Sequence, residues 1–167
     1  MLYRLYKPED FAPLYSIEEV CFQPPHRFSR SYIRQLIEQP DAATWIAEQE
    51  QSIGGFGIVE WSREIDEIVA YIQTLEVLPE GRGQGVGGEL LRCMENSASK
   101  AGASTIWLHV DAGNAAAIRL YERCGFKISG REEDYYGRGT LGLVYLKALR
   151  EVKALHEVKA FRAEPGR

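Results

Sequence analysis

A run of glycines headed by one arginine predicts a phosphate-binding loop, which is the clearest chemistry that this chain offers. The run extends over Leu78–Gly88 and follows an apolar, strand-like segment, Tyr71–Val77. A helical pattern comes next, with apolar residues every four positions from Val86 to Ala98. Glycines at a helix start let backbone N–H groups approach an anion, while the helix dipole and Arg82 add positive charge. We therefore expect a phosphorylated ligand at this position.

Two other interpretations of the run are weaker. Gly83, Gly85 and Gly88 match the dinucleotide-binding pattern G-x-G-x-x-G, and Asp111 could serve as its ribose-binding acid. However, Pro79–Arg82 separates the glycines from the strand, whereas the turn of a dinucleotide-binding domain follows its strand directly. The run also lacks a Walker lysine, which excludes a P-loop nucleotide site. A glycine loop without any ligand would be costly in conformational entropy.

The pattern Arg82-x-x-Gly85-x-Gly87 resembles the phosphate-binding motif of the GCN5-related N-acetyltransferase (GNAT) family. The segment Val110–Phe126 is similar to a second signature of that family, and the two motifs occur in the expected order. The resemblance covers nearly the whole chain, residues 2–147. It implies an α/β fold with about four helices and a mixed sheet of about seven mostly antiparallel strands. The sheet would be splayed in a V between its parallel fourth and fifth strands, with acetyl-CoA in the opening.

The resemblance also implies which residues hold acetyl-CoA. The backbone groups of Leu75 and Val77 would bind the pantetheine arm, and the Val77 N–H would face the thioester oxygen. Asn114 would contact the cofactor, although a helix N-cap explains this residue equally well. The pyrophosphate would lie on Arg82 and on the backbone of the residues that follow it, namely Gly83, Gln84, Gly85, Val86, Gly87 and Gly88.

Three side chains would move protons, again by resemblance. Tyr121 would act as the general acid toward the CoA sulfur, since a phenol with an ordinary pKa of about 10 is protonated at neutral pH. Its alternative role is core packing. His109 stands where protein N-terminal acetyltransferases of the RimI-like and NatE-type groups carry their base, and Tyr71 matches the tyrosine paired with histidine in the NatE type. We expect Tyr71 and His109 to hold one water between them and to deprotonate the amine. Glu76 is an alternative base, and the sequence predicts no metal site.

Two segments are expected to bind the acceptor. One is the loop between the first two helices, with Phe22 and His26, and the other is the hairpin before the last strand, with Tyr135 and Tyr136. The tyrosine pair looks like the pair with which N-terminal acetyltransferases clasp a peptide backbone. The adjoining acidic residues 132–134 would favour a cationic acceptor. In each case an ordinary exposed loop is the alternative.

The predicted activity is transfer of an acetyl group from acetyl-CoA to a primary amine, by direct attack in a ternary complex. The favoured acceptor is the N-terminal α-amine of a protein or peptide. Its pKa of about 7.7–8.0 makes it far easier to deprotonate near neutral pH than a lysine, whose pKa is about 10.4. Two alternatives remain. The acceptor could be a small amine (a polyamine, an aminoglycoside or an amino acid), or the protein could bind acyl-CoA without catalysis.

Hydrophobic periodicity predicts a single domain over residues 1–147, followed by a helical or frayed tail over 148–167. The expected strands cover residues 2–6, 44–48, 53–61, 68–77, 105–110, 126–128 and 140–147. Glycines at 54, 55 and 57 suggest a bulge in the third strand. The expected helices begin near Pro8, Ser29, Gln84 and Asn114. The first helix should bury Phe11, Leu14, Ile17 and Val20.

Composition limits the partners. The 167 residues carry a net charge of −4, with 45% hydrophobic and 26% charged residues, as in an ordinary globular domain. This charge argues against general affinity for nucleic acid or for an anionic membrane. The three cysteines cannot all pair, and we expect reduced thiols. Together with an N-terminus that lacks a secretory pattern, they predict a cytoplasmic location. We expect a monomer or a homodimer, and the sequence does not decide between them.

Overall fold

The computed structural model describes residues 1–150, which form seven strands and four α-helices. The strands are β1 (Leu2–Leu5), β2 (Ala42–Gln49), β3 (Ser52–Arg63), β4 (Ile68–Val77), β5 (Ala103–Asp111), β6 (Lys127–Glu133) and β7 (Leu141–Ala148). The helices are α1 (Phe11–Cys21), α2 (Arg30–Ile37), α3 (Val86–Lys100) and α4 (Ala115–Arg123). Short 3-10 turns at Pro8–Asp10 and Pro79–Gly81 precede α1 and α3. Most of the tail expected over residues 148–167 lies outside the described residues.

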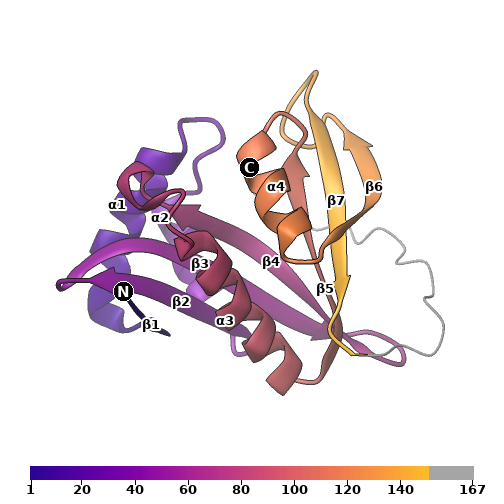
Figure 1. Ribbon diagram of the computed structural model, residues 1–167, viewed down its shortest axis with the longest axis horizontal. Coiled ribbons are helices and arrows are strands. Elements are labelled where there is room, and N and C mark those ends of the chain that lie inside the picture. The colour runs from indigo at the N-terminus through magenta and orange to yellow at the C-terminus, as the bar shows by residue number, and fades with distance from the viewer. Residues whose placement is uncertain (151–167) are drawn as a thin grey trace.

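All seven strands belong to one sheet, in the order β1-β2-β3-β4-β5-β7-β6. Strands β4 and β5 are parallel, whereas every other neighbouring pair is antiparallel. Figure 1 shows that β4 and β5 diverge after their shared end, so that the sheet opens as a V. The predicted α/β fold with a parallel fourth and fifth strand is therefore confirmed. Within residues 1–150, no helix is both long and apolar enough to cross a lipid bilayer.

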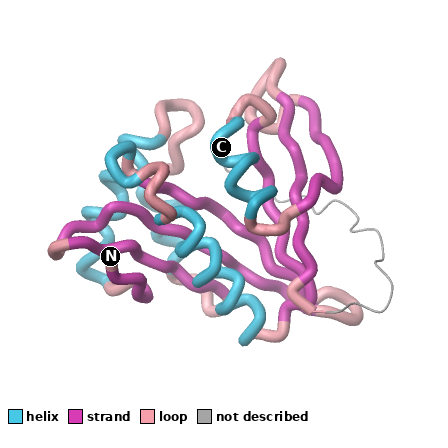
Figure 2. Tube along the Cα trace, viewed as in Figure 1, coloured by secondary structure: helices cyan, strands magenta, loops and turns pink. Residues whose placement is uncertain are grey.

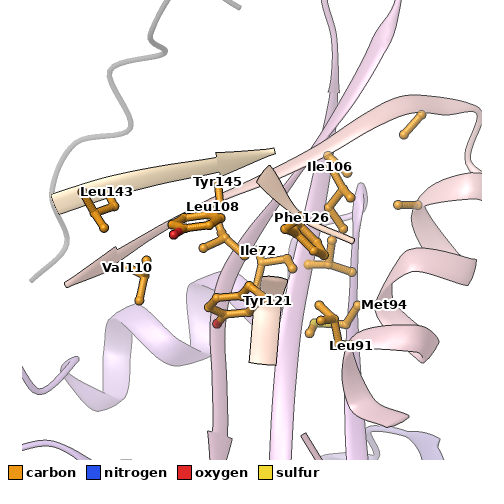
Figure 3. Close-up of a cluster of buried hydrophobic side chains, with 14 residues drawn as sticks. Ile72, Leu91, Met94, Ile106, Leu108, Val110, Tyr121, Phe126, Leu143 and Tyr145 are labelled. Atoms are coloured by element: carbon orange, nitrogen blue, oxygen red, sulfur yellow. The ribbon is translucent and has the colours of Figure 1, made fainter. Parts of the chain in front are cut away.

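Helices cover both faces of the sheet and enclose two large cores, beside a small cluster of Ala47, Val86 and Leu90. On one face, α1 and α2 pack through residues such as Leu14 and Ile33 against Phe56 and Ile58 of β3. On the other face, α3 and α4 contribute to the larger core. Figure 3 shows this core, in which Leu91 and Met94 of α3 lie with Ile72, Ile106, Leu108, Tyr121 and Phe126. The larger core joins the two arms of the sheet, since it contains both Ile72 of β4 and Leu108 of β5.

Helix α1 departs from its predicted burial at one position. Phe11, Leu14 and Ile17 are buried, but Val20 is 54% exposed. A helix repeats every 3.6 residues, so each three-residue step from Phe11 to Val20 falls short of a full turn. After three such steps, the Val20 side chain points about 180° away from that of Phe11. The buried position is taken instead by Glu18, whose carboxylate accepts the Phe28 N–H at 2.7 Å. This contact holds the loop before α2 against the helix.

The glycines of β3 do mark a bulge. Ile53 pairs with Glu48 and Gly55 pairs with Ala47, so Gly54 is the extra residue. A Cβ on Gly55 would lie 2.7 Å from the Glu76 carbonyl oxygen of β4, whereas one on Gly54 would meet nothing within 4 Å. Gly55 is therefore required for close approach of the strands, and Gly54 is not.

We predict that Gly55→Ala destabilises the protein by about 1 to 3 kcal/mol, because a backbone atom cannot move aside cheaply. Gly54→Ala, the matched control, should change stability by less than about 0.5 kcal/mol. Urea unfolding of both variants measures the difference. Equal stability of the two variants would contradict the assigned packing.

Candidate active site

The opening between β4 and β5 contains the main cleft. The two strands pair only as far as Tyr71 and Trp107. Beyond this point Gln73 has no register partner in β3, since Val59 pairs with Ile72 and Ile58 pairs with Thr74. This bulge lies where β4 leaves β5. A cleft of about 910 Å³ occupies the opening and is lined by residues of both strands.

Backbone groups at the end of β4 face this opening. Leu78 donates its N–H to the Gly54 carbonyl at 2.9 Å, and Val77 is the register partner of Gly55. Successive residues of an antiparallel pair direct their N–H groups alternately toward and away from the partner strand. The N–H groups of Leu75 and Val77 therefore point away from β3, toward the side on which β5 diverges.

The predicted phosphate-binding loop forms the start of α3. Gly83 and Gly85 have φ angles of 74° and 85°, which glycine adopts without strain. Gly85 is the N-cap of α3, and no side chain caps this helix end. The N–H groups of a first helical turn have no partner within the helix. Because Cβ atoms at Gly83 and Gly85 would meet open space, the loop has both donors and room for a phosphate.

Arg82 lies between this loop and the end of β4. Its Nε donates to the Val77 carbonyl at 2.9 Å, and its Nη2 is 3.7 Å from the Cys21 sulfur. The guanidinium is thus next to the backbone groups that face the opening. Among the remaining loop residues, Gln84 donates from Nε2 to the Glu80 carbonyl at 2.7 Å, a contact that closes the loop on itself.

Helix α4 brings Asn114 and Tyr121 to the cleft. Asn114 caps the helix, since its Oδ1 accepts the Ala117 N–H at 3.1 Å. Tyr121 is buried and packs at 5.8 Å from the Phe126 ring, yet it also lines the cleft. In Figure 3 it lies beside Ile72. Both predicted roles of Tyr121, core packing and access to the site, are compatible with this position.

His109 and Tyr71 are in direct contact, and a third aromatic residue joins them. The Tyr71 hydroxyl is 3.0 Å from His109 Nδ1 and 3.4 Å from the Tyr135 hydroxyl. The Tyr135 ring stacks on the imidazole at 3.9 Å with an interplanar angle of 11°. The water that we expected between Tyr71 and His109 has no room, because the parallel strands still touch at Tyr71 and bring the side chains within hydrogen-bond distance.

Burial sets the charge state of His109. Its side chain is 2% exposed, and its Nε2 is 3.1 Å from a carboxylate oxygen of Glu132. Burial lowers the pKa of His109 from the ordinary value of 6.5, and the charge and hydrogen bond of Glu132 oppose this shift only in part. His109 is therefore neutral at neutral pH and able to accept a proton.

Glu76, the alternative base, occupies a different place. It is 2% exposed, accepts from the Thr74 hydroxyl at 2.7 Å and does not line the cleft. Within residues 1–150, no group of three or more His, Cys, Asp and Glu side chains is arranged to hold a metal ion.

The two segments that were predicted to bind the acceptor both line the cleft. Phe22 and His26, and opposite them Tyr135 and Tyr136, all line the cleft. Figure 2 shows the loop after α1 and the β6–β7 turn at the same end of the opening, one on each side of it. The acidic hairpin is shorter than expected, because residues 132 and 133 end β6. Sequence reasoning missed further lining residues, among them Tyr32, Gln35, Glu60 and Gln73.

Glu60 and Gln73 form a pair in the floor of the cleft. Gln73 donates from Nε2 to Glu60 at 2.7 Å, and Glu60 is the register partner of Tyr71. Glu60 and Gln73 are polar residues within two otherwise largely apolar strands. This pattern could have identified them from the sequence. Among the described residues that line the cleft, Glu60 and Asp111 supply carboxylates, and none is a lysine or arginine.

The family model of the Acetyltransferase (GNAT) family matches residues 11–126, more than half of the chain. The chain therefore belongs to the GNAT acetyltransferase family, and the glycine loop at the start of α3 fits the phosphates of its CoA donor.

Relatives include enzymes with protein and with small-molecule acceptors. Over 72 residues the chain is 39% identical to the ribosomal protein bS18-alanine N-acetyltransferase of Escherichia coli K12, covering 43% of this chain and 47% of that one. Over 100 residues it is 34% identical to the streptothricin acetyltransferase of Streptomyces lavendulae, covering 59% and 52%. The chain thus spans about half the length of these relatives. An aminoglycoside 6'-N-acetyltransferase, solved with coenzyme A, shares the fold with a TM-score of 0.80 at 16% identity, over 92% of this chain and 100% of that one.

Asn114 allows its two roles to be separated. We predict that Asn114→Ala costs about 1 kcal/mol of stability through loss of the helix cap, whereas Asn114→Ser retains a capping oxygen and most of that stability. If the side-chain amide also contacts coenzyme A, both variants should bind CoA more weakly. Calorimetric CoA titration and thermal unfolding measure the two effects. If Asn114→Ser binds CoA as tightly as the parent protein does, Asn114 serves only as the helix cap.

Proposed function

We propose that this protein transfers an acetyl group from acetyl-CoA to a primary amine, and that its preferred acceptor is the N-terminal α-amine of a protein or peptide. The direct contact of Tyr71 with a buried, neutral His109 beside the split of the sheet carries the proposal. Such a pair supplies a base next to the opening in which the family binds its donor. We also propose a cytoplasmic location, supported by three cysteines that are all free thiols.

The donor would be held by the loop and the end of β4. Bound acetyl-CoA supplies the acetyl group as a thioester. The first-turn N–H groups of α3 and the Arg82 guanidinium would hold its phosphates. The N–H groups of Leu75 and Val77 would orient the remainder of the donor along β4, with the Val77 N–H stabilising charge on the acetyl oxygen.

The base would act through Tyr71. His109 Nδ1 faces the Tyr71 hydroxyl, and its buried side chain leaves no direct approach for an amine. Tyr71 Oη would accept the amine proton while giving its own proton to His109 Nδ1. An α-amine with a pKa of about 7.7–8.0 is already partly neutral near neutral pH and therefore suits such a weak base.

The acid would be Tyr121. It is buried at the wall of the cleft, on the helix that packs beside the phosphate loop. A Cβ on Gly87 of α3 would lie 3.1 Å from Leu120, the neighbour of Tyr121, which shows how close the two helices are. The Tyr121 hydroxyl would donate its proton to the departing thiolate sulfur.

The cleft suits an amine acceptor. Its lining carries the carboxylates of Glu60 and Asp111, which favour an ammonium group entering from solvent. Tyr135 and Tyr136, in edge contact at 4.7 Å, would flank the acceptor backbone. The bacterial bS18-alanine N-acetyltransferase relative supports a protein N-terminus. The streptothricin acetyltransferase relative supports a small amine as the second candidate.

We predict that His109→Ala and Tyr71→Phe each lower kcat by about 10²- to 10⁴-fold, the usual contribution of a positioned base. Assays of CoA release with a saturating acceptor measure the effect. His26→Ala serves as the control, since His26 lines the cleft away from the pair and should alter KM more than kcat. Unchanged kcat in both variants would exclude the pair as the base.

The pH dependence of kcat follows from the state of His109. Because catalysis needs the neutral imidazole and burial lowers its pKa, kcat should rise through one inflection below pH 6.5 and then stay level. A kcat profile that still rises between about pH 7 and pH 9 would contradict this assignment.

A panel of acceptors decides between the two substrate classes. We expect peptides with free N-termini to give higher kcat/KM than polyamines, aminoglycosides or amino acids, with N-acetylated peptides as blanks. The reverse order would favour the small-amine function. CoA binding without release of CoA in the presence of any acceptor would favour a binding protein.

A further inference from the structure

Glu132 reaches His109 across an intervening strand. It lies on β6, whereas His109 lies on β5, and β7 separates the two strands in the sheet. The register partner of Glu132 on β7 is Gly142, which pairs in turn with Asp111 of β5, two residues beyond His109 on the same face. A Cβ on Gly142 would lie 2.7 Å from Tyr135 Cβ. This glycine therefore lets Tyr135 lie over β7, where its ring stacks on the imidazole.

The contacts at the two ring nitrogens determine the tautomer. A carboxylate can only accept, so the 3.1 Å contact with Glu132 requires the proton on Nε2. Nδ1 of the neutral ring then carries the lone pair and must accept from the Tyr71 hydroxyl at 3.0 Å. The opposite tautomer would place a lone pair against the carboxylate. The arrangement makes the nitrogen that faces Tyr71 the basic one.

We propose that Glu132 is a positioning residue, which holds His109 in its Nε2–H tautomer and stabilises the imidazolium that forms during the reaction. This inference rests on the proposed function for its kinetic consequence. As the amine gives a proton to Tyr71 Oη, the original Tyr71 proton moves to His109 Nδ1. The imidazolium keeps its Nε2–H bond to Glu132, and the amine lone pair becomes available. The extra proton leaves His109 by the reverse path after the transfer.

Other groups around His109 do not supply this function. Tyr71 of β4 and Tyr135 of the β6–β7 turn are phenols, and Trp107 of β5 contacts the imidazole edge at 5.3 Å. Asp111 is two residues further along the same face of β5, but Glu132 is the carboxylate in hydrogen-bond contact. Its side chain is 32% exposed, so the buried ring is paired with a partly hydrated carboxylate.

The test compares Glu132→Gln with Glu133→Gln. In the first variant the new side-chain amide can still accept from Nε2 but carries no charge, whereas Glu133 is the neighbouring exposed residue with the same charge. We expect Glu132→Gln to lower kcat by about 10- to 100-fold, the loss typical of a residue that orients a histidine. The acid inflection of kcat should move to lower pH, since the carboxylate that favours the imidazolium is gone. The sequence suggested that Glu133 helps to attract the acceptor, but Glu133 is exposed on the opposite face of β6 and does not line the cleft. Glu133→Gln should therefore change neither, and Glu132→Asp should recover part of the loss.

An NMR titration of His109 keeps the inference separate from the activity. Imidazole ¹⁵N shifts of the whole protein should report the Nε2–H tautomer, and Glu132→Gln should lower the pKa of His109 relative to Glu133→Gln. The same pKa in both variants, or an Nδ1–H tautomer, would overturn the inference even in a folded, active enzyme. If the NMR result holds while no amine is acetylated, the proposed function fails and the pairing stands. A purely structural link would alter the melting temperature of Glu132→Gln without moving the acid inflection, and this outcome would also overturn the inference.

Discussion

The short pairing of β4 with β5 is the constraint on which the rest of the structure depends. The two parallel strands share hydrogen bonds only as far as Tyr71 and Trp107, and then the sheet divides. Backbone groups deprived of a neighbouring strand need other partners, since leaving them unpaired in a buried place costs free energy. The end of β4 therefore offers an edge that an extended ligand can complete. The glycine loop at the start of α3 adds an anion site at the end of that edge.

The last point of contact between the two strands would also determine where the proposed chemistry takes place. Tyr71 lies at this point, and His109 lies two residues beyond Trp107, the register partner of Tyr71. The two side chains are within hydrogen-bond distance, and the cleft opens immediately beyond them. Burial keeps the imidazole neutral, and the bulge at Gln73 changes which residues of β4 face the acceptor side. The result is a nearly buried imidazole in contact with a phenol at the wall of the cleft, and these two groups form the proposed base.

Much of this arrangement could be predicted from the sequence. The strand Ile68–Val77 and the cap at Asn114 agree with their predicted positions, because apolar alternation and capping chemistry are local signals. The motif residues locate the donor loop and the pair Tyr71 and His109. The exposed Val20 shows the limit of local reasoning, since a three-residue spacing drifts around a helix.

Contacts that depend on how strands pass one another could not be predicted. The bulge at Gln73 requires knowledge of the register between β3 and β4. Likewise, Glu132 was interpreted as an acidic residue for binding the acceptor, whereas it contacts His109 across β7. No spacing in the sequence relates these two residues, because they belong to strands that are not adjacent in the sheet.

The stacking of Tyr135 on His109 has a consequence for how such a protein can change over evolution. The turn that carries Tyr135 is a surface that an acceptor would meet, and it is also one wall of the pocket that holds the imidazole. Gly142 keeps the tyrosine in that place. A mutation that reshapes this turn for a new acceptor would therefore also change the surroundings of His109 in the proposed base. Acceptor preference can drift more freely on the opposite wall, at Phe22 and His26, where the loop is anchored to α1 instead of to the strands that carry the base.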